Sequence, residues 1–83
     1  MTVYYNFEWD PAKERINRDK HGVAIGEAAT VFKDSKALSI YDQNHSEIEE
    51  RWITMGISGK GRILVVMHTL REESEESVTI III

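Results

Sequence analysis

Two arginines and a histidine in the second half of the chain have the side chains needed to cut RNA. Arg51 opens the stretch RWITMGISGKGRILVVMHTLR, and His68 and Arg71 lie near its end. A neutral imidazole can take a proton from a ribose 2′-hydroxyl, and guanidinium groups can stabilise the charge that then builds on the phosphate. These residue types predict metal-independent RNA cleavage by internal transfer, provided that the fold brings them together.

This stretch is predicted to fold into a hairpin. Its two halves, residues 51–58 and 62–69, are rich in apolar and β-branched residues and are joined around Gly59 and Lys60. A two-residue loop pairs Ser58 with Gly61, so the numbers of facing residues sum to 119. A one-residue slip would place every side chain on the other face of the sheet.

The register of 119 is favoured because it sets large apolar residues, such as Ile53 and Val66, opposite one another. It also sets Arg51 opposite His68 on one face, where paired Cβ atoms lie about 4.5–5.5 Å apart. A permanent cation at that distance would lower the pKa of His68. Strand ends also carry arginine and histidine simply because they meet water, so a plain surface role stays open.

The rest of the chain supplies the elements that must hold this hairpin. Asp10 is a good N-cap and Gly22 a good residue to end a helix. The patterns predict strands over residues 3–9, 37–42 and 78–83, and helices over 11–21 and 23–32. The sequence therefore predicts one small α+β domain, residues 1–83, with two N-terminal helices packed on a mostly antiparallel sheet of about four to five strands.

The last strand, VTIIII, needs cover on both of its faces because consecutive isoleucines point to both. We expect it to be internal or covered by a partner, with REESEES as its connection to the strand before it. Apolar surface near residues 81–83 is expected to remain exposed and to favour a homodimer or a partner's segment.

A basic stripe is predicted on the first helix. Lys13, Asn17 and Lys20 fall on one side of it at 100° per residue, where they could meet phosphates or an acidic partner. A solvated face is the plainer alternative. His21 is expected to complement the helix dipole, and His45 to be an exposed loop histidine.

Composition limits the function classes. The formal net charge is −4, but residues 1–71 balance and the excess lies in the acidic run of residues 72–76. The chain has no cysteine, no clustered metal ligands and no glycine-rich nucleotide loop, so neither a metal nor a cofactor is expected. No segment approaches the ~20 apolar residues of a membrane span, and no signal peptide is recognised. These features predict a cytoplasmic protein.

Two segments, FEWDPAKERINRDKHGVAIGEAATVF and RWITMGISGKGRILVVMHTLR, together resemble the BrnT family of bacterial toxins. The combination in this order, within residues 7–71, is specific, although each short piece alone is weak. The matching residues are Trp9, Asp10, Lys13, Asn17, Lys20, His21, Gly22, Val23, Glu27, Ala28, Phe32, Arg51, Trp52, Gly56, His68 and Thr69.

The resemblance implies a RelE-like fold and a ribonuclease toxin that inhibits translation. Arg51 and Arg71 would bind the scissile phosphate, His68 would act as acid or base, and Lys13 and Lys20 would assist RNA or antitoxin binding. The implied partner is BrnA, a ribbon-helix-helix antitoxin. The complex of the two represses their operon, so operator DNA is expected to be bound only through that complex.

The sequence departs from the family at its end. Family members continue into a serine-alanine-arginine segment and a basic C-terminal helix, whereas VTIIII ends this sequence. Because that segment carries an arginine of the implied site, we expect weak or no RNA cleavage. Two alternatives stay open: an inactive member of the family that binds an antitoxin and takes part in operon control, and a structural domain whose sheet pairs with a second copy.

Overall fold

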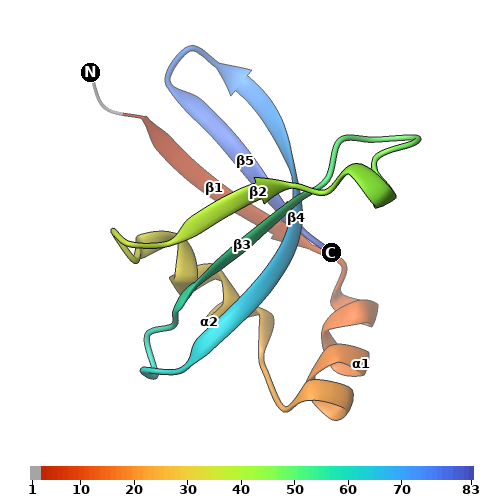
Figure 1. Ribbon diagram of the computed structural model, residues 1–83, viewed down its shortest axis with the longest axis vertical. Helices are drawn as coiled ribbons and strands as arrows, with labels where there is room; N and C mark the ends of the chain where they lie inside the picture. Colours follow the sequence, from red (N-terminus) through yellow and green to blue (C-terminus); the bar gives the residue numbers. More distant parts are fainter. Residues whose placement is uncertain (1–2) are drawn as a thin grey trace.

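The computed structural model describes residues 3–83, and its helices and strands follow the predicted order (Figure 1). The elements are β1 (Tyr4–Trp9), α1 (Pro11–His21), α2 (Ile25–Thr30), the 3₁₀ turn η1 (Val31–Lys33), β2 (Leu38–Tyr41), the 3₁₀ turn η2 (Gln43–His45), β3 (Trp52–Ile57), β4 (Ile63–Ser74) and β5 (Ser77–Ile82). The strands form one sheet in the order β1-β5-β4-β3-β2, in which β1 and β5 are parallel and the other pairs antiparallel. The predicted α+β fold is confirmed.

Helix α1 has the predicted bounds. The side chain of Asp10 accepts a hydrogen bond from the backbone N–H of Ala12 at 2.9 Å, and Gly22 ends the helix with a φ of 68°. Yet α1 contributes no buried residue, and its central Ile16 is 62% exposed. The helix extends to the lower right in Figure 1, away from the middle of the sheet.

One face of the sheet is covered by α2 and η1, and we call it the covered face. The periodic apolar residues of α2 and η1 pack on the strands, as the sequence predicts. Phe7, Trp9, Ala29, Phe32 and Leu64 surround this core half-buried. The fully buried apolar residues are Ile25, Ala28, Val31, Val66, Ile80 and Ile82.

The β3–β4 hairpin differs by one residue from the predicted register. Trp52 faces His68 and Thr54 faces Val66, so facing residue numbers sum to 120. Since neighbouring residues of a strand point to opposite faces, Arg51 lies on the face opposite to His68. The predicted register and the predicted Arg51–His68 pair are therefore wrong.

The loop of this hairpin explains part of the error. The N–H of Ser58 donates to the carbonyl of Arg62 at 2.8 Å, which leaves three residues, 59–61, in the loop. Gly61 has a φ of 79°, a conformation that a residue with a side chain resists. A three-residue loop with a left-handed glycine is a common hairpin connection, and it shifts the register by one.

Close packing between η1 and β3 explains the rest of the error in the predicted register. A Cβ atom on Gly56 would lie 3.0 Å from both the Ala37 Cβ and the Val31 Cγ1, so only glycine allows η1 to approach β3 this closely. Thr54 is 1% exposed, and its hydroxyl is 2.7 Å from that of Ser39, which satisfies its hydrogen bonding. A small residue and a satisfied hydroxyl are therefore buried in place of larger apolar side chains.

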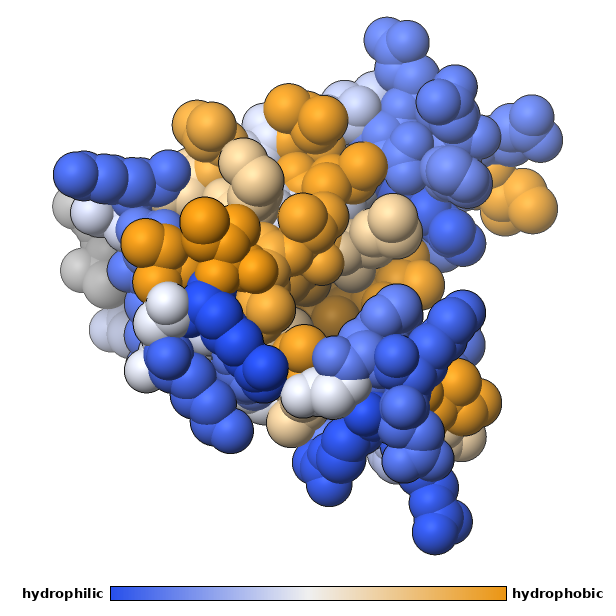
Figure 2. All heavy atoms as spheres, turned by 60° about the horizontal axis from the view of Figure 1, so that its bottom comes forward, coloured by the Kyte–Doolittle hydropathy of each residue, from blue (hydrophilic) through white to orange (hydrophobic). Residues whose placement is uncertain are grey.

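The displaced apolar side chains lie on the other face of β2, β3 and β4, which no helix within residues 3–83 covers. Figure 2 shows an apolar area in the middle of the molecule, with hydrophilic residues on both sides of it. We call this surface the open face. Its exposed apolar residues are Leu38, Ile40, Met55, Ile57, Ile63, Val65 and Met67.

Strand β5 lies inside the sheet, between β1 and β4, as predicted for VTIIII. Ile80 is 2% exposed, while Ile81 and Ile83 are half-buried. The predicted connection REESEES is mostly strand, because β4 extends to Ser74 and only Glu75 and Glu76 form the turn.

Candidate active site

His68 lies on the covered face and is 3% exposed. Its ring stands edge-on to that of Phe32, with the ring centroids 4.8 Å apart. Burial lowers the pKa of His68 below its ordinary value of 6.5, although the nearby carbonyl of Val66 opposes the shift. The imidazole is therefore neutral at pH 7, but the covering side chains keep a substrate away from it.

Arg51 lies just before β3 and is fixed through its backbone. Its N–H donates to the hydroxyl of Ser46 at 3.0 Å, and its carbonyl accepts from the N–H of Asp42 at 2.8 Å. One guanidinium nitrogen is 3.7 Å from the carboxylate of Glu49, while the buried Nε has no hydrogen-bond partner. The Arg51 side chain is 36% exposed, so its outer nitrogens can bind an anion, whereas the buried Nε is out of reach.

Arg71 shares the face of Arg51, but two carboxylates already occupy its guanidinium. It donates to Glu73 at 2.7 Å and to Glu8 of β1. Glu73 and then Glu8 raise the pKa of Arg71, and Arg71 with Thr79 lowers that of Glu73. Arg71 therefore joins β1 to β4, and a phosphate would have to displace a carboxylate to reach it.

A second histidine is placed better for proton transfer. The Nδ1 of His45 is 2.9 Å from the Oδ2 of Asp42, within a single 3₁₀ turn. The carboxylate is buried at 8% exposed, whereas the His45 side chain is 62% exposed. With the proton on Nδ1 facing the carboxylate, the lone pair on Nε2 is free to accept a proton from solvent or substrate.

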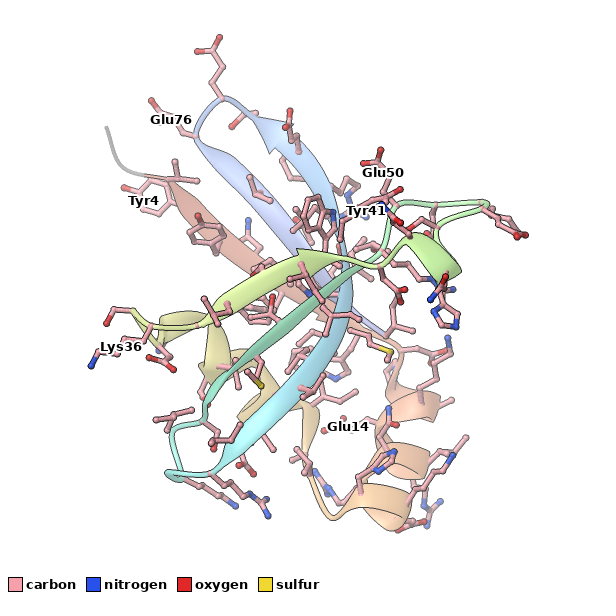
Figure 3. The ribbon with its side chains drawn as sticks, viewed as in Figure 1. Tyr4, Glu14, Lys36, Tyr41, Glu50 and Glu76 are labelled. Carbon is pink, nitrogen blue, oxygen red and sulfur yellow. The ribbon has the colours of Figure 1, made fainter. Side chains whose placement is uncertain are left out.

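The loop between β2 and β3 gathers these groups. The hydroxyl of Ser46 donates to the Asp42 carbonyl at 2.5 Å and accepts from the N–H of Arg51, so one serine ties the histidine turn to the arginine. Figure 3 labels Tyr41 and Glu50 near the two ends of this loop. We call Asp42, His45, Ser46 and Arg51 the loop cluster. It combines an oriented base with a cation, which suits proton abstraction beside a phosphate.

Sequence reasoning identified Arg51 but missed the rest of the loop cluster. His45 was predicted to be exposed, which is confirmed, but no role was given to Asp42. The available signal is the spacing Asp-x-x-His, which places both side chains on one side of a single helical turn. The spacing becomes informative only if residues 42–45 form such a turn.

Two of the three residues of the predicted basic stripe on α1 are exposed. Lys13 and Lys20 are exposed, while Asn17 is half-buried and faces a groove. A guanidinium nitrogen of the neighbouring Arg18 lies 3.3 Å from a carboxylate oxygen of Glu14, one turn earlier in the helix. Lys13 and Lys20 form a basic surface on α1.

The strongest ion pair of the covered face has a structural role. Arg62 donates to both carboxylate oxygens of Glu27, at 2.8 and 2.6 Å, and the hydroxyl of Ser58 donates as well, at 2.7 Å. These bonds, that of Arg62 first, lower the pKa of Glu27 to about 2. They attach the β3–β4 hairpin to α2.

Two classes of site are not found in residues 3–83. No three histidine, cysteine, aspartate or glutamate side chains come together there in a way that could hold a metal ion. In the same residues, no helix is long and apolar enough to cross a membrane.

Comparison with models of protein families gives a match over most of the chain. The model of the family described as "Ribonuclease toxin, BrnT, of type II toxin-antitoxin system" matches residues 9–83. This range includes the loop cluster, both helices and the strands from β2 onwards, but only the last residue of β1. No curated protein matches the chain.

Proposed function

The chain belongs to the BrnT family of ribonuclease toxins of type II toxin–antitoxin systems, and on that premise we propose that it inhibits translation by cutting RNA and is neutralised by a protein antitoxin. The family match over residues 9–83 carries this proposal. The loop cluster supports it, because an oriented histidine and a partly exposed arginine on the same loop suit metal-independent cleavage.

The proposed reaction is an internal transfer. The Nε2 of His45 takes the proton of a ribose 2′-hydroxyl, and the 2′-oxygen attacks the adjacent phosphorus. The bond from phosphorus to the 5′-oxygen breaks, and that oxygen takes a proton from water, which leaves a 2′,3′-cyclic phosphate. Arg51 binds the phosphate and stabilises the charge that builds on it.

A second function remains as the alternative: a member of the family that binds an antitoxin without cutting RNA. Two observations favour it. His68 is closed off within the core, and Arg71 is held by Glu8 and Glu73, so the site first predicted from the sequence is not assembled. The chain would then contribute to operon control only through the complex.

The proposed partner is a small ribbon-helix-helix antitoxin of the BrnA type, with operator DNA bound only by the complex, in the cytoplasm. The type II classification of the family supports a protein antitoxin. The exposed cations of α1 offer a surface for its acidic residues. A homodimer is a further form of assembly that the open face would allow.

Regulated expression in bacteria tests the proposal. Expression of the chain alone should stop growth and fragment RNA, and coexpression with the product of the neighbouring gene should restore both. Normal growth together with intact RNA would reject the ribonuclease. If the chain then still bound the neighbouring product and repressed the operon with it, the alternative function would hold.

A matched variant shows whether toxicity comes from RNA cleavage or only from overexpression of the protein. His45→Gln keeps a polar side chain of similar reach but cannot act as a base at neutral pH. It should accumulate to the same level and remain harmless. Equal toxicity of the variant and the parent would remove His45 from the mechanism, while the family assignment would stand.

A further inference from the structure

The outer edge of β2 is an unpaired strand edge in the middle of the chain. Strand β2 is the outermost strand on its side of the sheet, and β4 and β3 separate it from β5. The segments before and after it, residues 31–37 and 42–51, lie at its two ends rather than along its outer edge (Figure 1). The edge is therefore formed and bounded by internal residues of the chain.

Two residues of this edge point their backbone groups outward. The N–H of Asp42 donates to the carbonyl of Arg51, so the even-numbered residues of β2 bond to β3 and the odd-numbered ones point away from it. Ser39 and Tyr41 thus present two N–H and two carbonyl groups, for which residues 3–83 supply no partner. Such an edge is a template for another extended segment.

The spacing of these groups matches that of a second copy of the strand. When two copies of β2 run antiparallel, with Ser39 of each opposite Tyr41 of the other, every outward N–H meets a carbonyl. A slip by two residues would set Tyr41 opposite Ala37. The N–H of Ala37 already donates to the carbonyl of Asp34 at 3.0 Å, so the Tyr41 carbonyl would be left without a donor. The Ser39–Tyr41 register therefore uses every outward group.

The side chains at the centre of this pairing are apolar. Ile40 lies opposite its own copy, and Leu38 lies diagonal to the Ile40 of the other strand, within cross-strand contact. Both side chains belong to the open face and are exposed in the single chain, at 62% and 65%. Pairing therefore removes apolar surface from water at the edge of the open face.

The exposed charges at the two ends of β2 are opposite in sign. Before the strand, Lys33 and Lys36 are exposed, while the carboxylate of Asp34 accepts from the N–H groups of Lys36 and Ile57. After the strand, the loop exposes three glutamates, at positions 47, 49 and 50. Figure 3 labels Lys36 and Glu50 at opposite ends of the strand. An antiparallel copy brings the basic end of each chain to the acidic end of the other.

We propose that two copies of this chain pair through β2 in the Ser39–Tyr41 register, and that each copy supplies Lys36 to the loop cluster of the other. In this register Asp42 lies opposite Leu38 of the second copy, so Lys36 of that copy follows about 7 Å further along, beside the turn of His45. Its ammonium group binds the phosphate together with Arg51. The role of Lys36 rests on the proposed function, whereas the pairing does not.

Charge variants at the centre of the interface test the pairing. Ile40→Glu and Ile40→Lys each set like charges opposite one another, so each should be monomeric by light scattering where the parent chain is a dimer. An equimolar mixture of the two should again form a dimer, because glutamate then faces lysine. Tyr4→Glu, at a position of the other edge strand that is 63% exposed, is the matched control and should leave the dimer unchanged.

Three results would overturn the pairing. The first is a parent chain that stays monomeric up to about 1 mM. The second is a dimer that both Ile40 variants leave intact. The third is a mixture of folded variants that stays monomeric. None of these results concerns RNA cleavage, so failure of the pairing and failure of the proposed function are distinguishable.

Mixed dimers test the role of Lys36. One chain carries Ile40→Glu and His45→Gln, and the other carries Ile40→Lys and Lys36→Gln, so one complete site remains, with His45 from one chain and Lys36 from the other. Cleavage should be about half that of the mixed dimer without the extra substitutions. With His45→Gln and Lys36→Gln together in one chain, no complete site remains, and cleavage should fall at least about tenfold, the usual effect of losing a charged hydrogen bond.

The opposite pattern would show that Lys36 acts within its own chain, and equal cleavage in the two arrangements would remove Lys36 from the site. Either result would overturn the exchange of Lys36 between copies. No cleavage by the mixed dimer that retains His45 and Lys36 in both chains would overturn the proposed function and the role of Lys36 together. Light scattering on the same samples would still decide the pairing.

Discussion

The two faces of the sheet are both rich in apolar side chains, but their chemistry differs. On the covered face, every titratable group that we described is neutral or paired: His68 is buried against Phe32, and Glu27 is bonded to Arg62. On the other face, Arg71 is bonded to Glu8 and Glu73, but the guanidinium of Arg51 is partly exposed, and β2, β3 and β4 expose apolar side chains. The covered face holds the fold together, and the open face with its adjoining loop is free to meet partners.

This difference shows why residue type alone is a weak guide to catalysis. His68 and His45 have the same imidazole, yet one fills the core and the other is oriented by a carboxylate at the surface. Burial and hydrogen-bond partners decide which of them can exchange a proton with a substrate. Substitutions confined to one face test whether the two faces differ in this way.

The largest effect is expected from the surface histidine. His45→Gln should slow RNA cleavage by roughly 10²–10⁴-fold, the usual effect of a positioned base. His68→Gln should reduce cleavage only as far as it reduces the folded fraction, because the ring is out of reach of RNA. Single-turnover cleavage with purified variants, corrected for the folded fraction, measures both. A folded His68→Gln that is inactive, beside a fully active His45→Gln, would reverse the assignment.

The next effect concerns close packing on the covered face. Gly56→Ala should lower the free energy of unfolding by about 1–3 kcal/mol, because the added methyl meets η1 at 3.0 Å. Gly26→Ala adds the same methyl where nothing lies within 4 Å, and should stabilise α2 by about 0.4–1 kcal/mol. Urea unfolding gives both values. Equal effects of the two substitutions would contradict the close approach of η1 to β3.

The third effect is a pH dependence that comes from the buried histidine. Because burial lowers the pKa of His68 in the folded state, the unfolded chain binds its proton first, near pH 6.5. Stability should therefore be fully present above pH 6.5 and fall as the pH drops below it, by at most about 1.4 kcal/mol per unit. His68→Gln should remove this slope, and an unchanged slope would show that another group causes it.

The smallest effect is expected on the open face. Ile63 is 70% exposed, so Ile63→Thr should change the free energy of unfolding by less than about 0.5 kcal/mol. Val66→Thr, at a covered position that is 4% exposed, should cost at least about 1 kcal/mol because its hydroxyl is buried. Light scattering should also show less self-association for Ile63→Thr. Equal losses of stability would show that the open face is covered in solution.

Local signals made much of the fold predictable from the sequence. The bounds of α1 follow from Asp10, Pro11 and Gly22, each of which acts through a short-range hydrogen bond or backbone preference. The internal position of β5 follows from its run of isoleucines, which demands cover on both faces. These features depend on few neighbours, so the sequence alone can specify them.

The register and the site could not be predicted, because each depends on a distant contact. Gly56 is buried because Val31 and Ala37 approach it, and hydrophobicity alone favoured burial of Ile53 instead. This one-residue difference in register places Arg51 on the face opposite to His68. The His45–Asp42 pair depends on a 3₁₀ turn that has no apolar periodicity to reveal it.

The parallel pairing of β1 with β5 has a consequence for synthesis. The first and last strands of the domain are neighbours, and β5 is also the strand that joins β1 to the rest of the sheet. Contacts between such distant segments form slowly and only after both have been made. During synthesis the sheet therefore stays incomplete until β5 has left the ribosome.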